Sequence, residues 1–129
     1  MPQPDHRVSL GQQGEELACR RLRQRGYAVL ARRYRTRYGE IDIVARDGDT
    51  MVFVEVKTRK TASCGAPAEA VTPLKRRRLA SMASDYLARH PPDARGVRFD
   101  VVAIRVDGDG NTQVDVIPNA FTLDDCGRT

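Results

Sequence analysis

The sequence predicts one α/β domain with a mixed sheet, whose elements follow the order helix, strand, strand, strand, helix, strand, strand. Apolar side chains recur at helical spacing over residues 9–25 and 73–89, and apolar and polar side chains alternate as in paired strands over residues 40–57. A length of 129 residues, of which 40% are hydrophobic and 30% charged, suits a single domain spanning 1–129. We expect its core over about residues 9–121, with a loose tail after 121.

The first helix is expected over residues 9–25. Ser9 can cap its start, and Gly26 is suited to its end. Its apolar side chains share one face and comprise Leu10, Leu17, Ala18 and Leu22. A short apolar run over residues 27–31 then predicts a strand.

The clearest pattern is a β-hairpin over residues 40–57, closed by a turn around Gly48 and Asp49. A turn centred on these two residues places Asp42 directly opposite Glu55. One face of this hairpin is entirely apolar and is therefore expected to face the core. Its residues are Ile41, Ile43, Ala45, Val52, Val54 and Val56.

The second helix is expected from Pro73 to about Arg89, because Thr72 can cap a helix that begins with proline. Its buried face is predicted to contain Leu79, Met82, Ala83, Tyr86 and Leu87. A loop of small side chains over residues 61–71 precedes this helix.

A C-terminal hairpin is expected after the second helix. Its strands are predicted over residues 99–106 and 113–117, around a turn rich in aspartate and glycine. On the first of these strands, we expect Asp100 to form an ion pair with an arginine.

The charge of the chain is unevenly distributed. Of 22 basic and 17 acidic side chains, residues 1–98 hold 20 and 11. Residues 20–37 contain eight arginines and no acid, and residues 75–78 read Lys-Arg-Arg-Arg. Such clusters attract phosphate backbones, although a merely solvated surface is the simpler alternative. The residues expected to bind nucleic acid are Arg32, Arg33, Arg35, Arg37, Arg59, Lys75, Arg76 and Arg77.

Three widely spaced cysteines, Cys19, Cys64 and Cys126, provide neither a disulfide framework nor a Cys-x-x-Cys motif, which favours a reducing compartment. No apolar run is long enough to cross a bilayer, and none resembles a signal peptide. We therefore expect a cytoplasmic protein that does not bind a membrane. The sequence leaves a homodimer open.

Asp42 and Glu55 suggest a metal site. Two carboxylates opposed across a hairpin at a Cβ separation of about 5 Å repel each other. Mg²⁺ or Mn²⁺ between them would relieve that repulsion, and Mg²⁺ prefers carboxylates, water and phosphate oxygens. Lys57 projects from the same face as Glu55 and could polarise a water or stabilise charge on a phosphate. The alternative is a solvated pair of charges, but the apolar run over residues 51–54 marks a covered strand.

A set of motifs spanning residues 11–121 resembles the YraN family, a bacterial group whose fold is similar to the PD-(D/E)XK nucleases and archaeal Holliday-junction resolvases. These motifs are Gly14-Glu15, Gly26-Tyr27, Gly39-Glu40-Ile41-Asp42-Ile43, Phe53-Val54-Glu55-Val56-Lys57-Thr58-Arg59 and Arg98-Phe99-Asp100. The resemblance implies a restriction-endonuclease-like α-β-β-β-α-β core with the hairpin at its centre. It also implies that Asp42 and Glu55 bind metal, that Lys57 is catalytic and that Glu15 completes the site. Cys64 departs from the aromatic residue usual at its position, which affects the packing of its loop rather than the metal ligands.

These observations predict a Mg²⁺- or Mn²⁺-dependent endonuclease that hydrolyses DNA phosphodiester bonds. Fold analogy alone favours branched or otherwise structured DNA. The expected catalytic residues are Glu15, Asp42, Glu55 and Lys57, of which the three acids also bind metal. Two alternatives remain: a non-catalytic nucleic-acid-binding accessory module, and a protein-interaction domain whose acids bind metal only for stability. The intact set of four residues favours the enzyme.

Overall fold

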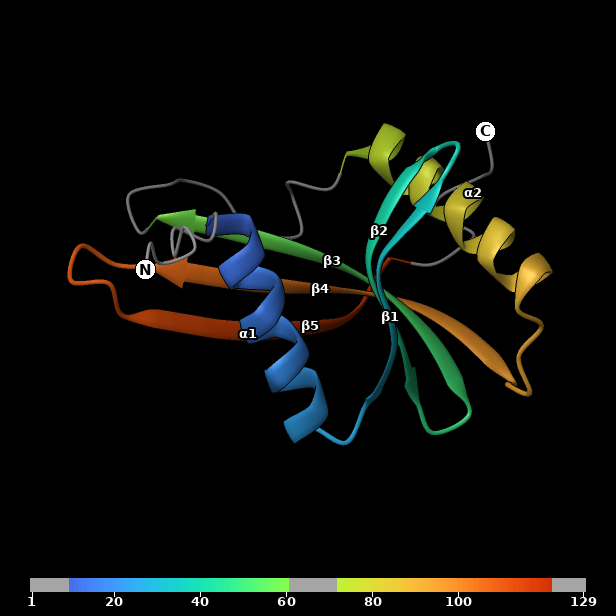
Figure 1. Ribbon diagram of the computed structural model, residues 1–129, viewed down its shortest axis with the longest axis horizontal. Helices are drawn as coiled ribbons and strands as arrows, with labels where there is room; N and C mark the ends of the chain where they lie inside the picture. Colours follow the sequence, from blue (N-terminus) through green and yellow to red (C-terminus); the bar gives the residue numbers. More distant parts are fainter. Residues whose placement is uncertain (1–9, 61–71, 122–129) are drawn as a thin grey trace, which may run out of the picture.

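The computed structural model describes residues 10–60 and 72–121, which form two helices and one five-stranded sheet. The elements are α1 (Leu10–Gln24), β1 (Ala28–Thr36), β2 (Gly39–Asp47), β3 (Thr50–Lys60), α2 (Pro73–Arg89), β4 (Gly96–Val106) and β5 (Thr112–Phe121). This is the predicted order, and Figure 1 shows the strands as one strongly twisted sheet. Within the described residues, no helix is long and apolar enough to span a membrane.

The sheet is mixed, as predicted. Its strands lie in the order β1-β2-β3-β4-β5. Only the central pair, β3 and β4, is parallel, and the other neighbouring strands are antiparallel. A parallel pair needs a crossover, and the segment that contains α2 provides it. β3 is therefore a central strand that is paired along both edges.

The register of the β2–β3 hairpin confirms the prediction from its turn. Val44 pairs with Phe53 and Asp47 with Thr50, so the turn contains two residues. Gly48 has a φ of 59°, in the left-handed region that such tight turns use. The apolar run over residues 51–54 is buried, which confirms that β3 is covered on both faces.

The two helices cover opposite faces of the sheet. Under α2, the buried cluster contains Ile41, Val44, Met51, Phe53, Leu79, Met82, Ala83, Tyr86, Phe99 and Val101. Under α1, it contains Ala18, Cys19, Leu22, Tyr27, Ile43, Ala45, Val52, Val54, Val102 and Ile104. Alternate residues of the central strands thus contribute to alternate clusters. The predicted faces of both helices are confirmed for Ala18, Leu22 and the four buried α2 residues, while Leu17 and Leu87 are partly buried.

The prediction that Ile41 shares a face with Ile43 is wrong. Ile41 lies in the cluster under α2 and not, as predicted, on the same face as Ile43 and Ala45. The regular pairing of β2 with β3 runs only as far as Ile43 and Val54. Simple alternation of side chains therefore does not extend to the start of β2.

β1 and the C-terminal strands are longer than predicted. β1 extends beyond the apolar run at 27–31 because Tyr34 reaches the cluster under α2, where its ring packs edge-on against Tyr86 at a centroid distance of 4.9 Å.

Thr72 accepts a hydrogen bond of 3.3 Å from the main-chain N–H of Lys75, which confirms the predicted N-cap of α2. Three predicted features lie outside the described residues: the Ser9 cap, the loop over 61–71 with Cys64, and the tail after 121 with Cys126.

Candidate metal and nucleic-acid site

Asp42 lies at the point where regular pairing between β2 and β3 ends. Its Oδ2 atom accepts a hydrogen bond of 2.8 Å from the main-chain N–H of Val56. The side chain thus takes the place of a main-chain acceptor just beyond the Ile43–Val54 pair. This contact fixes the carboxylate of Asp42 against β3.

The carboxyl groups of Asp42 and Glu55 lie within hydrogen-bonding reach of each other, as the predicted register requires. The pKa of Asp42 is raised to about 7, first by burial and then by the negative charge of Glu55. The hydrogen bond from Val56 opposes this shift, and the charge of Glu15 adds to it. Two partly buried carboxyl groups that share a site repel each other when both are ionised, and a bound cation would relieve that repulsion.

Lys57 lies beside this pair. Its Nζ atom is 3.3 Å from Oε1 of Glu55, and the two side chains are only 20% and 17% exposed. Lys75 of α2 lies within hydrogen-bonding reach of Lys57. Burial lowers the pKa of Lys57, but the contacts with Lys75 and Glu55 outweigh burial and raise it. The hydrogen bond with Lys57 lowers the pKa of Lys75. The site thus includes a second lysine, which sequence reasoning assigned only to nucleic-acid binding.

Glu15 approaches the site from α1 but is engaged elsewhere. Its two carboxylate oxygens accept hydrogen bonds of 3.2 and 3.0 Å from Nε of Arg33. Over residues 10–60 and 72–121, no group of three or more histidine, cysteine, aspartate or glutamate side chains is placed to hold a metal ion. Asp42 and Glu55 are brought together, whereas Glu15 is held by an arginine instead of completing a three-carboxylate set.

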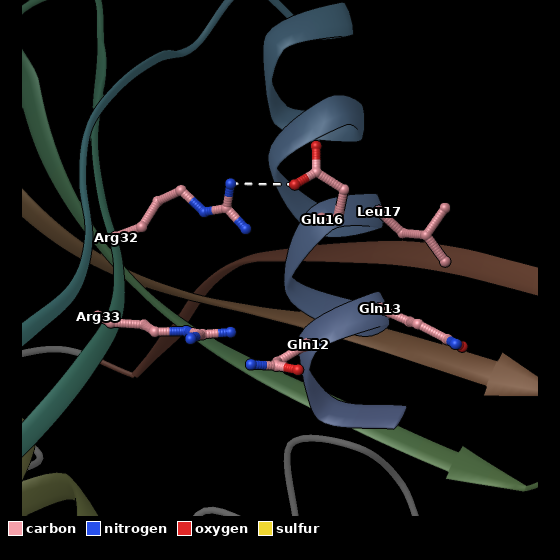
Figure 2. Close-up of a pocket in the computed structure, with 6 residues that line it drawn as sticks. All are labelled: Gln12, Gln13, Glu16, Leu17, Arg32 and Arg33. Carbon is pink, nitrogen blue, oxygen red and sulfur yellow. Dashed lines mark hydrogen bonds and ion pairs between the residues drawn. The ribbon is translucent and has the colours of Figure 1, made fainter. Parts of the chain in front are cut away.

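The arginines of β1 are partly neutralised by acids that are distant in sequence. Arg32 forms an ion pair of 3.0 Å with Glu16 of α1, and Arg35 lies 3.5 Å from Glu40 of β2. Figure 2 shows Arg32 and Arg33 extending from β1 towards α1. The absence of acids within residues 20–37 is therefore compensated in part by the fold.

The remaining basic residues gather where β1 meets α2. Arg35 and Arg37 border a hollow of about 450 Å³ together with Arg89 of α2. Lys75, Arg76 and Arg77 lie in the first two turns of α2, and Arg59 is half-buried near the end of β3. Two basic clusters separated by about 40 residues in sequence thus contribute to neighbouring surfaces. Their contact with nucleic acid remains a prediction.

Asp100 forms the expected ion pair and is fully buried. Nε of Arg98 lies 2.8 Å from its Oδ1 atom, and the hydroxyl of Tyr27 donates a hydrogen bond of 3.0 Å to its Oδ2 atom. The main-chain N–H of Asn119 donates to Oδ1 at 2.9 Å. Arg98 also reaches Asp47 at 3.2 Å. This network has a structural role, because it joins β5, the turn after α1 and the β2–β3 hairpin to β4.

Comparison with known proteins places the chain in a family. The model of the uncharacterised protein family UPF0102 matches residues 14–104. A UPF0102 protein of Anaeromyxobacter dehalogenans is 46% identical over 93% of this chain and 89% of its own. One from Symbiobacterium thermophilum is 48% identical over 87% of this chain and 95% of its own, and one from Geobacter sulfurreducens is 46% identical over 92% of each. The chain therefore belongs to family UPF0102, which is the YraN family that its motifs resemble.

Proposed function

We propose that this chain is a Mg²⁺- or Mn²⁺-dependent nuclease that hydrolyses phosphodiester bonds in DNA. The observation that carries the proposal is the position of Lys57, whose Nζ atom lies 3.3 Å from a carboxylate oxygen of Glu55, while Glu55 lies within hydrogen-bonding reach of Asp42. Two acids and a lysine on adjacent strands match the donor set that metal-assisted hydrolysis of a phosphodiester needs.

The donor chemistry of the pair fits a hard divalent cation. Mg²⁺ is bound in proteins by one or two carboxylates and fills its other positions with water and substrate phosphate oxygens. Burial and the charge of Glu55 raise the pKa of Asp42, and a cation held by Asp42 and Glu55 would compensate that charge. When bound, it would supply a more acidic water and polarise the phosphate.

The roles of this chain's own residues follow from their positions. Lys57 is half-buried and carries its charge beside the acids, where it can hold a phosphate oxygen or orient the attacking water. Arg35 and Arg37, with Lys75 and Arg77 of α2, provide cationic groups on neighbouring surfaces for the flanking phosphates. Branched or structured DNA as the substrate is supported by the family resemblance alone.

A second candidate is a nucleic-acid-binding accessory module that does not cleave. One observation favours it: within the described residues no three-carboxylate cluster is assembled, and Glu15 is engaged by Arg33. Such a protein would retain DNA binding through its arginines without hydrolysis.

A cleavage assay on linear, nicked, flapped and four-way DNA, with Mg²⁺ or Mn²⁺, tests the proposal. We expect cleavage by the unsubstituted protein, and loss of both cleavage and metal binding in Asp42→Asn and Glu55→Gln. Asp115→Asn is the matched control, because Asp115 is exposed on β5, at the opposite edge of the sheet from β1. Metal-independent DNA binding with no cleavage of any substrate would favour the accessory module.

A further inference from the structure

A groove of about 620 Å³ separates α1 from β1, and two adjacent arginines reach into it. It is lined by Gln12, Gln13, Glu16, Leu17, Arg32 and Arg33. Neighbouring residues of a regular strand point to opposite faces of the sheet. Arg33, however, has a φ of 51°, in the left-handed region that is uncommon for residues other than glycine. This conformation breaks the alternation, so Arg32 and Arg33 both face α1 (Figure 2).

A strained backbone at an arginine favours a functional explanation. The guanidinium of Arg33 binds both oxygens of Glu15 through Nε, at 3.2 and 3.0 Å. The Arg33 side chain is 41% exposed, whereas that of Glu15 is only 12% exposed. A solute can therefore reach the arginine far more easily than the glutamate. Because the guanidinium faces solvent, an anion from solution can compete with Glu15 for it.

Glu15 is held close to the candidate cation site. Gly14 of α1 packs directly against Thr58 of β3, the residue that follows Lys57. Across the sheet, Arg32 pairs with Ile43 and Tyr34 with Ile41, so the register places Arg33 opposite Asp42. The carboxylate of Glu15 is near enough to Asp42 for its charge to act on that residue.

We propose that the groove between α1 and β1 is a binding site for a phosphate of the DNA backbone. This phosphate displaces Glu15 as the ion-pair partner of Arg33. Released from the arginine, Glu15 then joins Asp42 and Glu55 as a third ligand of the cation. The inference rests on the proposed function and deepens it, because it makes completion of the cation site depend on the substrate. By linkage, phosphate at Arg33 and cation at the acids each raise the affinity for the other.

Binding of Mn²⁺ in the absence of DNA, measured by titration calorimetry, tests the first half of the proposal. Arg33→Asn removes the guanidinium, and asparagine tolerates a left-handed φ better than other side chains. We expect this variant to bind Mn²⁺ more tightly than the unsubstituted protein, on the order of tenfold, because affinity rises with the number of charged ligands. The gain should vanish in the double variant Glu15→Gln, Arg33→Asn.

Arg32→Gln is the matched control, because it breaks the neighbouring ion pair with Glu16 and leaves Glu15 in place. It should bind Mn²⁺ as the unsubstituted protein does. If thermal unfolding shows that Arg33→Asn does not fold, Arg33→Gly replaces it, since glycine adopts a φ of 51° without strain.

The second half of the proposal requires the same titration with a 20-base-pair DNA duplex present. The duplex should tighten Mn²⁺ binding by the unsubstituted protein. It should leave Mn²⁺ binding by Arg33→Asn unchanged. Equal Mn²⁺ affinity of the unsubstituted protein and Arg33→Asn would overturn the inference, and the proposed function would survive if Asp42→Asn still lost the metal. If neither protein bound Mn²⁺, the proposed function itself would fail, and the inference with it.

Discussion

A Cβ atom on Gly14 of α1 would overlap the Oγ1 atom of Thr58 in β3. The helix and the strand therefore meet here without room for any side chain on the helix. The neighbours of these two residues are Glu15 and Lys57, which belong to the candidate site. A single close contact thus determines how near the acid of α1 comes to the acids and the lysine of the hairpin.

Gly14→Ala should lower the free energy of unfolding by about 1–3 kcal/mol, because the added methyl group forces α1 away from β3. Alanine has a higher helix propensity than glycine, by about 1 kcal/mol. The sign of the change in the free energy of unfolding therefore shows whether steric overlap or helix propensity dominates. Urea denaturation measures the change.

Thr58→Ala supplies the control background for this substitution. Without Oγ1, the nearest atoms to the new methyl group are Cδ1 of Ile104 at 3.3 Å and Cβ of residue 58 at 3.4 Å, which leaves a tight but tolerable contact. Gly14→Ala should then cost less than 1 kcal/mol or be stabilising. An equal loss in both backgrounds would show that the overlap with Thr58 is not the cause.

Tyr27→Phe should destabilise the fold, because it removes one hydroxyl from the network around Asp100. That hydroxyl donates to Asp100 at 3.0 Å and accepts from Nη2 of Arg98 at 2.6 Å. Loss of a buried hydrogen bond to a charged group lowers the free energy of unfolding by about 1.5–3 kcal/mol. Tyr38→Phe is the matched control, because Tyr38 lies at the surface, and it should change stability by less than about 0.5 kcal/mol.

Tyr38 is 42% exposed, and its hydroxyl accepts a hydrogen bond of 2.9 Å from Nη2 of Arg37. A similar loss of stability in Tyr27→Phe and Tyr38→Phe would contradict a special role for the buried network.

Asp42 should make the metal-free protein less stable as the pH rises from about 4 to about 7. Its pKa is raised from an ordinary 3.8 to about 7, mainly by burial and the charge of Glu55. Between these values the native state binds more protons than the unfolded state, so the free energy of unfolding falls as the pH increases. The stabilisation is complete below about pH 4 and lost above about pH 7.

Asp42→Asn tests this pH dependence. The amide oxygen can still accept from Val56, and the variant carries no charge beside Glu55. With a chelator present, its stability relative to the unsubstituted protein should increase between pH 4 and pH 7, reaching on the order of 1–3 kcal/mol at pH 8. Asp115→Asn, on exposed β5, should show no such trend. A stability difference that did not change with pH would contradict the role of burial.

The sequence predicts the centre of the site because the β2–β3 register is local. The two-residue turn fixes which residues face each other, and the opposition of Asp42 and Glu55 follows from it. The approach of Lys75 to Lys57 could not be predicted, because it depends on how α2 packs after the crossover. No local rule relates residues on separate elements in this way.

Two departures from strand alternation also escaped prediction. Strand alternation predicts that Arg33 and Arg32 lie on opposite faces of the sheet. The left-handed φ of Arg33, which breaks this alternation, cannot be predicted from the residue type, because arginine seldom adopts it. Ile41 lies beyond the regular pairing of β2 with β3, and its partner on β1, Tyr34, also packs under α2, so alternation is broken on both strands. Both residues flank Asp42 in the fold, where the sheet is least regular.

DNA binding should depend strongly on salt. Each phosphate that the protein neutralises contributes about −0.9 to the slope of log K against log salt concentration. Arg35→Glu combined with Arg77→Glu should flatten the slope and leave the fold intact, since both side chains are exposed. Arg95→Glu combined with Arg105→Glu is the control for net charge, because both arginines are exposed and lie outside the basic clusters and the net charge changes by the same amount. A slope near zero for the unsubstituted protein would exclude phosphate contacts as the basis of binding.

Lys57→Ala should separate catalysis from binding. Asp42 and Glu55 would still hold the cation and the arginines would still hold DNA, so both affinities should remain while cleavage falls by roughly 10²-fold or more. Lys60→Ala is the matched control, because Lys60 lies on the same strand but is exposed at its end. One cleavage time course and one Mn²⁺ titration for each variant provide the comparison. Cleavage by Lys57→Ala at the rate of Lys60→Ala would remove Lys57 from the mechanism, and loss of Mn²⁺ binding in Lys57→Ala would show that the lysine organises the acids instead of acting on the phosphate.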